Sequence, residues 1–207
     1  MQKEGCMREN NRLPVKNLVL VAMFGAMSFV LMLFEFPVPF LVPTFYEMDF
    51  SEVPVLIGTF TMGPWAGVCI ELVKILLKLL FKGTSTAYIG DIANFLIGCS
   101  LVVPAGVIYR RKKTKKSAIW GMVAGTLFMV VAGSFINGCV MLPWYAEHFF
   151  GGMEPIIEAG AAVHAGIDSV TTFVVMAVAP FNLMKGILTG VLTFLLYKRI
   201  SGIIKRF

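Results

Sequence analysis

The pattern of apolar and polar positions is dominated by long apolar runs with short polar segments between them. A helix that crosses a bilayer needs about 20 predominantly apolar residues, and most of these runs approach that length. The pattern therefore predicts an all-α integral membrane protein with six transmembrane helices. The predicted spans are residues 17–36, 53–63, 64–81, 88–109, 117–142 and 176–197.

Two features set the boundaries of these spans. Gly63-Pro64 separates the short second run from the third, because proline has no amide hydrogen to donate and clashes with the preceding turn. The second and third spans are therefore expected to form a hairpin. The stretch 165–178 is interpreted as part of a long outer connection, residues 147–178, that leads into the last span.

Composition agrees with a membrane protein. Hydrophobic residues make up 57% of the 207 residues, charged residues 14%, and the mean hydropathy is +0.81. Soluble proteins average about 45–50% apolar and about 25% charged residues. We expect a multi-pass membrane protein. Its four cysteines and two histidines show no metal-ligand spacing, so no metal site is expected.

Fourteen of the 18 lysines and arginines fall into three groups, which lie before the first span, between the fourth and fifth spans, and after the last span. The positive-inside rule places all three groups, and with them the N- and C-termini, in the cytoplasm. We therefore expect a basic N-terminal segment (1–16), one six-helix membrane domain (17–200) and a basic tail (201–207). The basic run 110–116 is interpreted as a topology signal beside anionic lipid and not as a nucleic-acid site.

A few polar residues lie within the predicted spans, where each is costly and usually faces the protein interior or a cavity. Asp91 and Asn94 are three residues apart and share one helix face. The same spacing places Asn182 and Lys185 on one face of the last span. With Asn137, these residues fall at similar depth on the outer side, which predicts a polar binding pocket. The alternative is structural: hydrogen bonds between helices and a buried Asp91–Lys185 ion pair.

Two further segments bear on this pocket. Glu71, Lys74 and Lys78 lie on one stripe of the third span, which favours a helix face with internally paired charges, ahead of a partner contact or an anchored loop. The loop 36–50 combines three prolines with aromatic residues. It is predicted to cover the pocket and to offer flat faces to a planar ligand. The alternative for its aromatic residues is an interfacial belt.

Motifs of energy coupling and catalysis do not occur in the sequence. The chain has no GxxxxGK[ST] phosphate loop, no GxSxG and no HExxH. We therefore expect neither an ATPase nor another enzyme.

Several motifs follow one another in a fixed order: FEFPVPF, MDFSEVP, GPWAGVCIELVKILL, GDIANFLIG, VVPAGVIYRRKKTKK and PFNLMKGIL. Over residues 17–200 the chain resembles the riboflavin-specific substrate-binding subunits (S-components) of energy-coupling-factor (ECF) transporters. The resemblance implies a six-helix S-component bundle that captures riboflavin at the extracellular face, as a transported ligand and without a cofactor. It also implies a location in the bacterial plasma membrane, and a membrane coupling (T) subunit and two cytoplasmic ATPases as partners. Another flat vitamin as ligand, or a membrane scaffold or sensor without transport, is the alternative.

The resemblance also assigns roles to residues. Ala22 and Ala26, four apart on the first span, are implied to dock on the coupling subunit, with ordinary packing inside the bundle as the alternative. Asp91 stands where the family has glutamate, which leaves its contact with the ligand open. Lys185 is expected to donate to ligand hydroxyls or to Asp91. The predicted pocket residues are Thr44, Asp91, Asn94, Asn137, Asn182 and Lys185.

Overall fold

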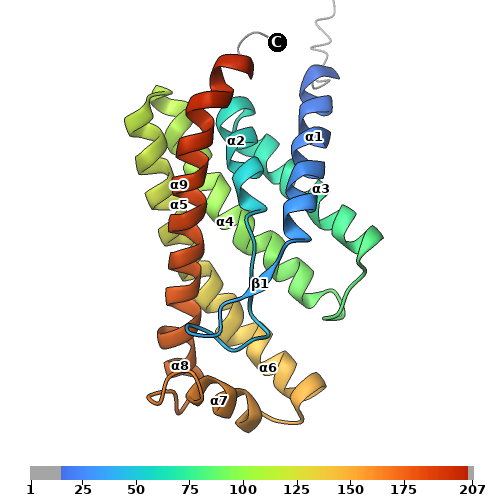
Figure 1. Cartoon of the computed structure of the whole chain (residues 1–207), viewed down its shortest axis with the longest axis vertical. Helices are drawn as coiled ribbons and strands as arrows, with labels where there is room; N and C mark the ends of the chain where they lie inside the picture. Colours follow the sequence, from blue (N-terminus) through green and yellow to red (C-terminus); the bar gives the residue numbers. More distant parts are fainter. Residues whose placement is uncertain (1–14, 205–207) are drawn as a thin grey trace, which may run out of the picture.

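The computed structural model describes the backbone of residues 15–204 and the side chains of residues 15–197. Most of the predicted N-terminal segment, and the last three residues of the predicted tail, lie outside the described residues. The described chain forms a bundle of long helices with a two-stranded ribbon and short helices at one end (Figure 1). In chain order the elements are α1 (Val15–Met32), β1 (Phe36–Pro37), β2 (Glu47–Met48), α2 (Glu52–Met62), α3 (Pro64–Phe81), α4 (Ile89–Lys112), α5 (Lys115–Ile136), the π-helical turn η1 (Asn137–Met141), α6 (Leu142–Tyr145), η2 (Ala146–Phe150), α7 (Glu154–Ala161), α8 (Val170–Phe173), η3 (Val174–Val178) and α9 (Ala179–Ile204).

The long helices run between two ends of the molecule. α1 begins and α9 ends at the top of Figure 1, and the turn between α4 and α5 lies near the same end. The antiparallel ribbon of β1 and β2 lies toward the other end, where α6, α7 and α8 also lie. The basic run 110–116 therefore shares one end of the bundle with the start of α1 and the end of α9.

Four helical stretches in the described part of the chain are long and apolar enough to cross a membrane. α2, with 11 residues, is shorter. α3 has 18 residues but carries the three charged side chains of Glu71, Lys74 and Lys78. The four stretches are Val15–Met32, Ile89–Lys112, Lys115–Phe150 and Val170–Tyr197.

The predicted break between the second and third spans is confirmed. α2 ends at Met62, α3 begins at Pro64, and the two helices contact each other. Gly63 between them has φ of 107°, a conformation that favours glycine because it has no Cβ. Pro64 occupies the first turn of α3, where its missing amide hydrogen costs nothing.

The helical stretches that correspond to the fifth and sixth predicted spans extend beyond the predicted boundaries. The fifth continues to Phe150 and the sixth begins at Val170, so the predicted outer connection 147–178 shrinks to the segment between them. The turns η1 and η2 keep the chain helical on both sides of Pro143, which cannot donate a regular helical hydrogen bond. The sixth stretch begins with a capping box, in which the Ser169 side chain accepts a hydrogen bond from the backbone amide of Thr172.

The buried apolar side chains form two clusters. One lies among α1, α2, α3, α4 and α5 and includes Phe24, Leu56 and Leu101. The other joins the ribbon segment, residues 36–50 with β1 and β2, to α6, α7, α8 and α9 and includes Val42 and Phe173. A polar cavity borders both clusters.

Candidate functional site

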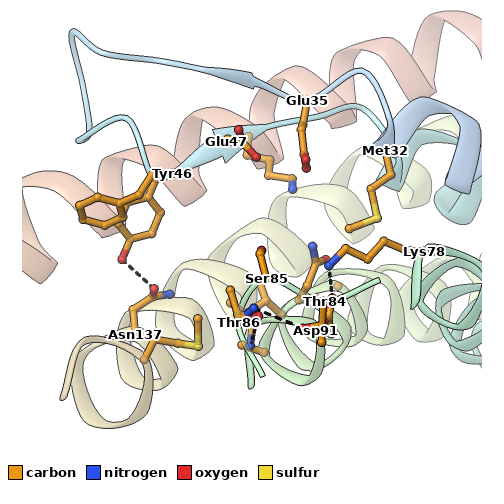
Figure 2. Close-up of a pocket in the computed structure, with 18 of the residues that line it drawn as sticks. Met32, Glu35, Tyr46, Glu47, Lys78, Thr84, Ser85, Thr86, Asp91 and Asn137 are labelled. Carbon is orange, nitrogen blue, oxygen red and sulfur yellow. Dashed lines mark hydrogen bonds and ion pairs between the residues drawn. The ribbon is translucent and has the colours of Figure 1, made fainter. Parts of the chain in front are cut away.

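The cavity of about 340 Å³ lies between the ribbon segment on one side and the α3–α4 connection, α4 and η1 on the other (Figure 2). Its size falls within the range of about 300–1,000 Å³ that is usual for small-molecule sites. Five of the six predicted pocket residues line it, and Thr44 does not: it is exposed on the ribbon loop. The five are Asp91, Asn94, Asn137, Asn182 and Lys185.

Two asparagines on the cavity wall are held by hydrogen bonds. The Tyr46 hydroxyl donates to Asn137 Oδ1 at 2.8 Å, and Asn137 Nδ2 donates to the Gly133 carbonyl at 2.8 Å. Asn182 Nδ2 donates to the Val178 carbonyl at 2.9 Å, one turn back in its own helix. A Cβ at Gly133 would lie only 2.8 Å from Asn182 Nδ2, so this glycine makes room for the second amide. Both amides are thus fixed in orientation before any ligand binds.

Asp91, which the sequence offered as one possible partner of Lys185, pairs elsewhere. Lys185 Nζ lies 2.9 Å from Asp49 Oδ2, and the backbone amide of Ser51 donates to the other Asp49 oxygen at 2.7 Å. Asp91 instead pairs with Lys78, which reaches it from α3 (Figure 2). The ribbon segment packs back over the bundle and brings Asp49 to Lys185.

A second ionic cluster is fully buried beside the cavity. Lys74 Nζ lies 2.7 Å from Glu71 Oε2 and 2.7 Å from Glu52 Oε1. The prediction that the charges of α3 are paired internally is confirmed for Glu71 and Lys74, whereas Lys78 pairs with α4. Glu52 begins α2, so Lys74 also holds the end of the ribbon segment, and Glu52 itself reaches the cavity wall.

Charged side chains also line one part of the cavity near the ribbon. Lys82 pairs with Glu35, and Glu47 lies close to both (Figure 2). Glu47 is exposed, but partial desolvation of its carboxyl, and then repulsion by Glu35, raise its pKa above the usual value, although Lys82 opposes this. The hydroxyl-bearing run 84–86 follows Lys82 and lines the same cavity.

Aromatic rings form the apolar part of the wall. The Tyr46 ring centroid lies 5.1 Å from that of Phe45 and 5.7 Å from that of Phe181, and all three residues line the cavity. The prediction that the 36–50 loop covers the pocket is therefore confirmed for Phe45, Tyr46 and Glu47. Rings next to fixed amides can bind a flat ligand on its faces and along its polar edge.

Sequence reasoning missed several residues of this site. Tyr46 and Asp49 belong to the loop 36–50, which the sequence presents only as a cover. Glu52 lies between that loop and the second predicted span, and residues 84–86 lie in a connection between spans. A signal was present in the run KGTSTAY at 82–88, which places three hydroxyls directly before the pair Asp91 and Asn94.

The small residues of α1 are divided between two faces. Ala22 and Ala26 are exposed on the outside of the bundle. Gly25 is buried, and a Cβ there would lie 2.5 Å from a methyl group of Val73 on α3. Packing inside the bundle therefore accounts for Gly25 and leaves Ala22 and Ala26 available to a partner.

Sequence comparison places this geometry in a family. A profile described as "ECF transporter, substrate-specific component" matches residues 16–197. The riboflavin transporter RibU of Staphylococcus aureus (strain TCH60) is 37% identical over 199 residues, which cover 96% of this chain and 97% of that protein. The riboflavin transporter FmnP of Bacillus subtilis (strain 168) is 30% identical over 190 residues, which cover 91% and 94%.

Solved structures agree with the sequence comparison. The structure described as "Structure and mechanism of the S component of a bacterial ECF transporter" matches with a TM-score of 0.71 and 36% identity, over 93% of this chain and 99% of that chain. ThiT from Listeria monocytogenes has a TM-score of 0.62 at 16% identity, over 92% and 97%, which is a likeness of fold alone. The chain belongs to the substrate-specific components of ECF transporters, which are integral plasma-membrane transport subunits and not enzymes.

Proposed function

We propose that this chain captures riboflavin in the cavity beneath the ribbon segment and presents it for ATP-driven uptake. The observation that carries the proposal is the pair of fixed amides, Asn137 and Asn182, next to the rings of Tyr46 and Phe181. The names of the relatives from S. aureus and B. subtilis support the same ligand.

The chemistry of riboflavin matches the two parts of the cavity wall. Its isoalloxazine ring system is flat and uncharged, with an edge that carries both hydrogen-bond donors and acceptors. A primary amide offers both as well, and Lys185 adds a donor. The ribityl chain carries hydroxyl groups, which suit the hydroxyls of residues 84–86 and the carboxylate of Asp91. Thr44, an expected contact from the family resemblance, lies away from the cavity wall, and we do not include it in this arrangement.

We further propose six membrane passages, with α2 and α3 as two short ones. The three basic groups of the sequence then face the cytoplasm, as the positive-inside rule requires. Support comes from the shared end of the bundle at which α1 begins, α9 ends and the basic run 110–116 lies. In this topology residues 1–16 and 201–207 are cytoplasmic, residues 17–200 form the membrane domain, and the ribbon segment faces outside.

The proposed partners follow from membership of the ECF transporter family. The missing GxxxxGK[ST] phosphate loop fits an ATPase activity that other chains supply. Two cytoplasmic ATPases and a membrane T subunit would supply the energy for uptake. Ala22 and Ala26 form a small, exposed stripe on α1, and such stripes allow another helix to approach closely. We assign the T-subunit contact to this stripe.

The test is a binding measurement with the purified full-length chain. Riboflavin fluorescence should be quenched on titration with the protein, and protein purified from cells grown with riboflavin should carry flavin absorbance. Absence of both results would overturn the proposal. Thiamine and biotin serve as competitors: if either displaces riboflavin at similar concentration, the alternative of another vitamin ligand is favoured.

A further inference from the structure

A second cavity lies on the outer surface of the bundle. It is a groove of about 470 Å³ between α5 and α9, two helices that pack against each other. Its rims are exposed aliphatic side chains, such as Val123 and Leu127 from α5 and Ile187 and Val191 from α9. Both helices belong to apolar stretches long enough to cross a membrane, so the groove is expected to lie at the depth of the bilayer hydrocarbon.

The floor of the groove contains two glycines, Gly186 and Gly190, and only Gly186 is required by packing. A Cβ at Gly186 would lie 2.5 Å from a Thr126 side-chain atom, so Gly186 allows the close approach of α5 and α9. Gly190, one turn further, would place its Cβ 3.8 Å from Met122, which is an ordinary contact. Its φ is not in the left-handed region either. The effect of Gly190 is to keep the groove open.

Two lysines continue the groove toward one end of the bundle. Ile119 is the first α5 residue of the groove, and Lys115 and Lys116 precede it by four and three positions. Residues at these spacings share one helix face, so both lysines lie one turn beyond the groove. Both are exposed. Trp120 is 62% exposed beside them, as is usual for aromatic residues at the membrane–water interface.

We propose that the α5–α9 groove, together with Lys115 and Lys116, binds one anionic phospholipid. One acyl chain lies along the groove, and the phosphate group accepts hydrogen bonds from the two ammonium groups. Along α5 the groove extends from Ile119 to Leu127, about 12 Å at 1.5 Å per residue. An anionic lipid has the required sequence of groups, an apolar chain followed by a negative charge at the level of the interface.

Charge complementarity favours a lipid over a helix of another protein. A partner helix would fill the apolar groove but would need acidic residues at one end to match the lysines. Anionic lipids carry that charge in every molecule, and basic residues next to a membrane attract them. The proposal concerns a surface away from the cavity beneath the ribbon segment, so it does not depend on the identity of the transported ligand.

The proposal can be tested by native mass spectrometry of the full-length chain, released from micelles that contain known amounts of phosphatidylglycerol or phosphatidylcholine. We expect one phosphatidylglycerol to remain bound preferentially. Lys115→Gln/Lys116→Gln should reduce its affinity about 25-fold, since each lysine near an anionic headgroup contributes roughly a 5-fold factor. The matched control is Lys112→Gln/Lys113→Gln, which removes the same charge from the end of α4 and should retain the lipid.

Filling the groove tests the apolar half of the site. Gly190→Leu should abolish retention of phosphatidylglycerol, while Val131→Leu, on an exposed part of α5 outside the groove, should not. Circular dichroism and a single symmetrical elution peak report whether each variant is folded. If Gly190→Leu does not fold, Val191→Phe fills the groove from an exposed position.

Three results would overturn the proposal. Equal retention of phosphatidylcholine and phosphatidylglycerol would exclude a headgroup site. Unchanged retention in both groove variants would exclude the acyl-chain site. Loss of assembly with the coupling subunit in Gly190→Leu, with lipid retention unchanged, would identify the groove as a surface for a partner helix.

Discussion

Lys185 and Asp49 are 136 positions apart in the sequence and form an ion pair of 2.9 Å between α9 and the segment that leads into α2. Both side chains are largely buried, with 12% and 4% of their surfaces exposed. The pair neutralises a lysine inside an apolar helix and at the same time fastens the ribbon segment over the cavity. Lys185 therefore has a structural partner in the cavity wall, and any ligand contact that it makes is added to this pair.

Lys185→Met should destabilise the protein by about 3–5 kcal/mol, because it leaves the Asp49 carboxylate buried without its partner. The double variant Lys185→Met/Asp49→Asn should recover part of this loss, since no unpaired charge remains. Thermal unfolding in detergent measures both. Lys82→Met is the control: its pair with Glu35 is more exposed, and we expect at most about 1 kcal/mol. Equal losses in all three variants would contradict the assigned pairing.

Asn182→Ala should weaken riboflavin binding by about 5- to 150-fold, the effect of about 1–3 kcal/mol for a lost buried hydrogen-bonding group. Fluorescence titration gives the dissociation constant. Leu196→Ala, on an exposed face of the same helix, is the control and should bind as the wild type does. Wild-type binding by Asn182→Ala would remove this residue from the proposed site.

Tyr46→Phe keeps the aromatic ring but removes the hydroxyl that donates to Asn137 Oδ1. We expect riboflavin to dissociate faster and to bind about 5-fold more weakly, because the side chain of Asn137 loses the bond that orients it and the ribbon segment loses one attachment. Stopped-flow fluorescence separates the two rate constants. A change in the association rate alone would not fit this explanation.

Protonation of Glu47 should stabilise the folded protein. Its pKa is raised by partial desolvation and then by Glu35, so the folded state holds the proton at pH values where the unfolded chain has released it. This contribution is fully present below the usual value of 4.5 and is lost as the pH rises through the folded pKa. Relative to Glu47→Gln, the wild type should therefore lose thermal stability as the pH rises above 4.5. Parallel pH profiles for the two proteins would count against a raised pKa.

Asp168, which is exposed to solvent, should give the opposite dependence of stability on pH. Hydrogen bonds from Thr172 and then from Ser169 lower the pKa of its carboxyl. The stability that it adds to the start of α8 is present above the usual value of 3.8 and is lost as the pH falls through the lower, folded pKa. Comparison of the wild type with Asp168→Asn by thermal unfolding across this range should show that loss in the wild type only.

A bulky residue on the exposed stripe of α1 should separate binding from transport. Ala26→Trp should leave riboflavin binding unchanged and should abolish uptake in cells that contain the coupling subunit and ATPases. Uptake of labelled riboflavin and co-purification of the partners are the measurements. Val131→Trp, an equally bulky change on exposed α5, should transport normally. If both variants transport equally well, the stripe is not the docking surface.

The long helices could be predicted because a membrane span leaves a strong one-dimensional signal, an apolar run of sufficient length. The break between α2 and α3 at Gly63-Pro64 could also be predicted, because its signal lies in two neighbouring residues. The end of the fifth stretch and the start of the sixth could not be predicted, because Pro143 and the polar residues near 168 usually mark the end of a helix. The π-helical turns that extend the fifth stretch and the Ser169 cap that begins the sixth depend on three-dimensional context.

The site was predicted in part for a similar reason. Spacing along helices located Asp91, Asn94 and Asn182, since periodicity shows which residues share a face. It could not show which acidic group meets Lys185. That choice depends on the path of the ribbon segment, and residues in an irregular segment have no periodicity from which their neighbours could be inferred.

The ribbon segment is attached at separate places: Tyr46 bonds to Asn137, Asp49 pairs with Lys185, and Glu35, just before β1, pairs with Lys82. The three partners belong to different parts of the bundle. The segment therefore cannot move away from the cavity by breaking one attachment while the other two stay intact. Opening of the cavity is then a concerted event whose barrier reflects all the attachments together. A ligand trapped underneath would leave slowly even if its own contacts were weak, and the residence time would be determined by the protein more than by the ligand.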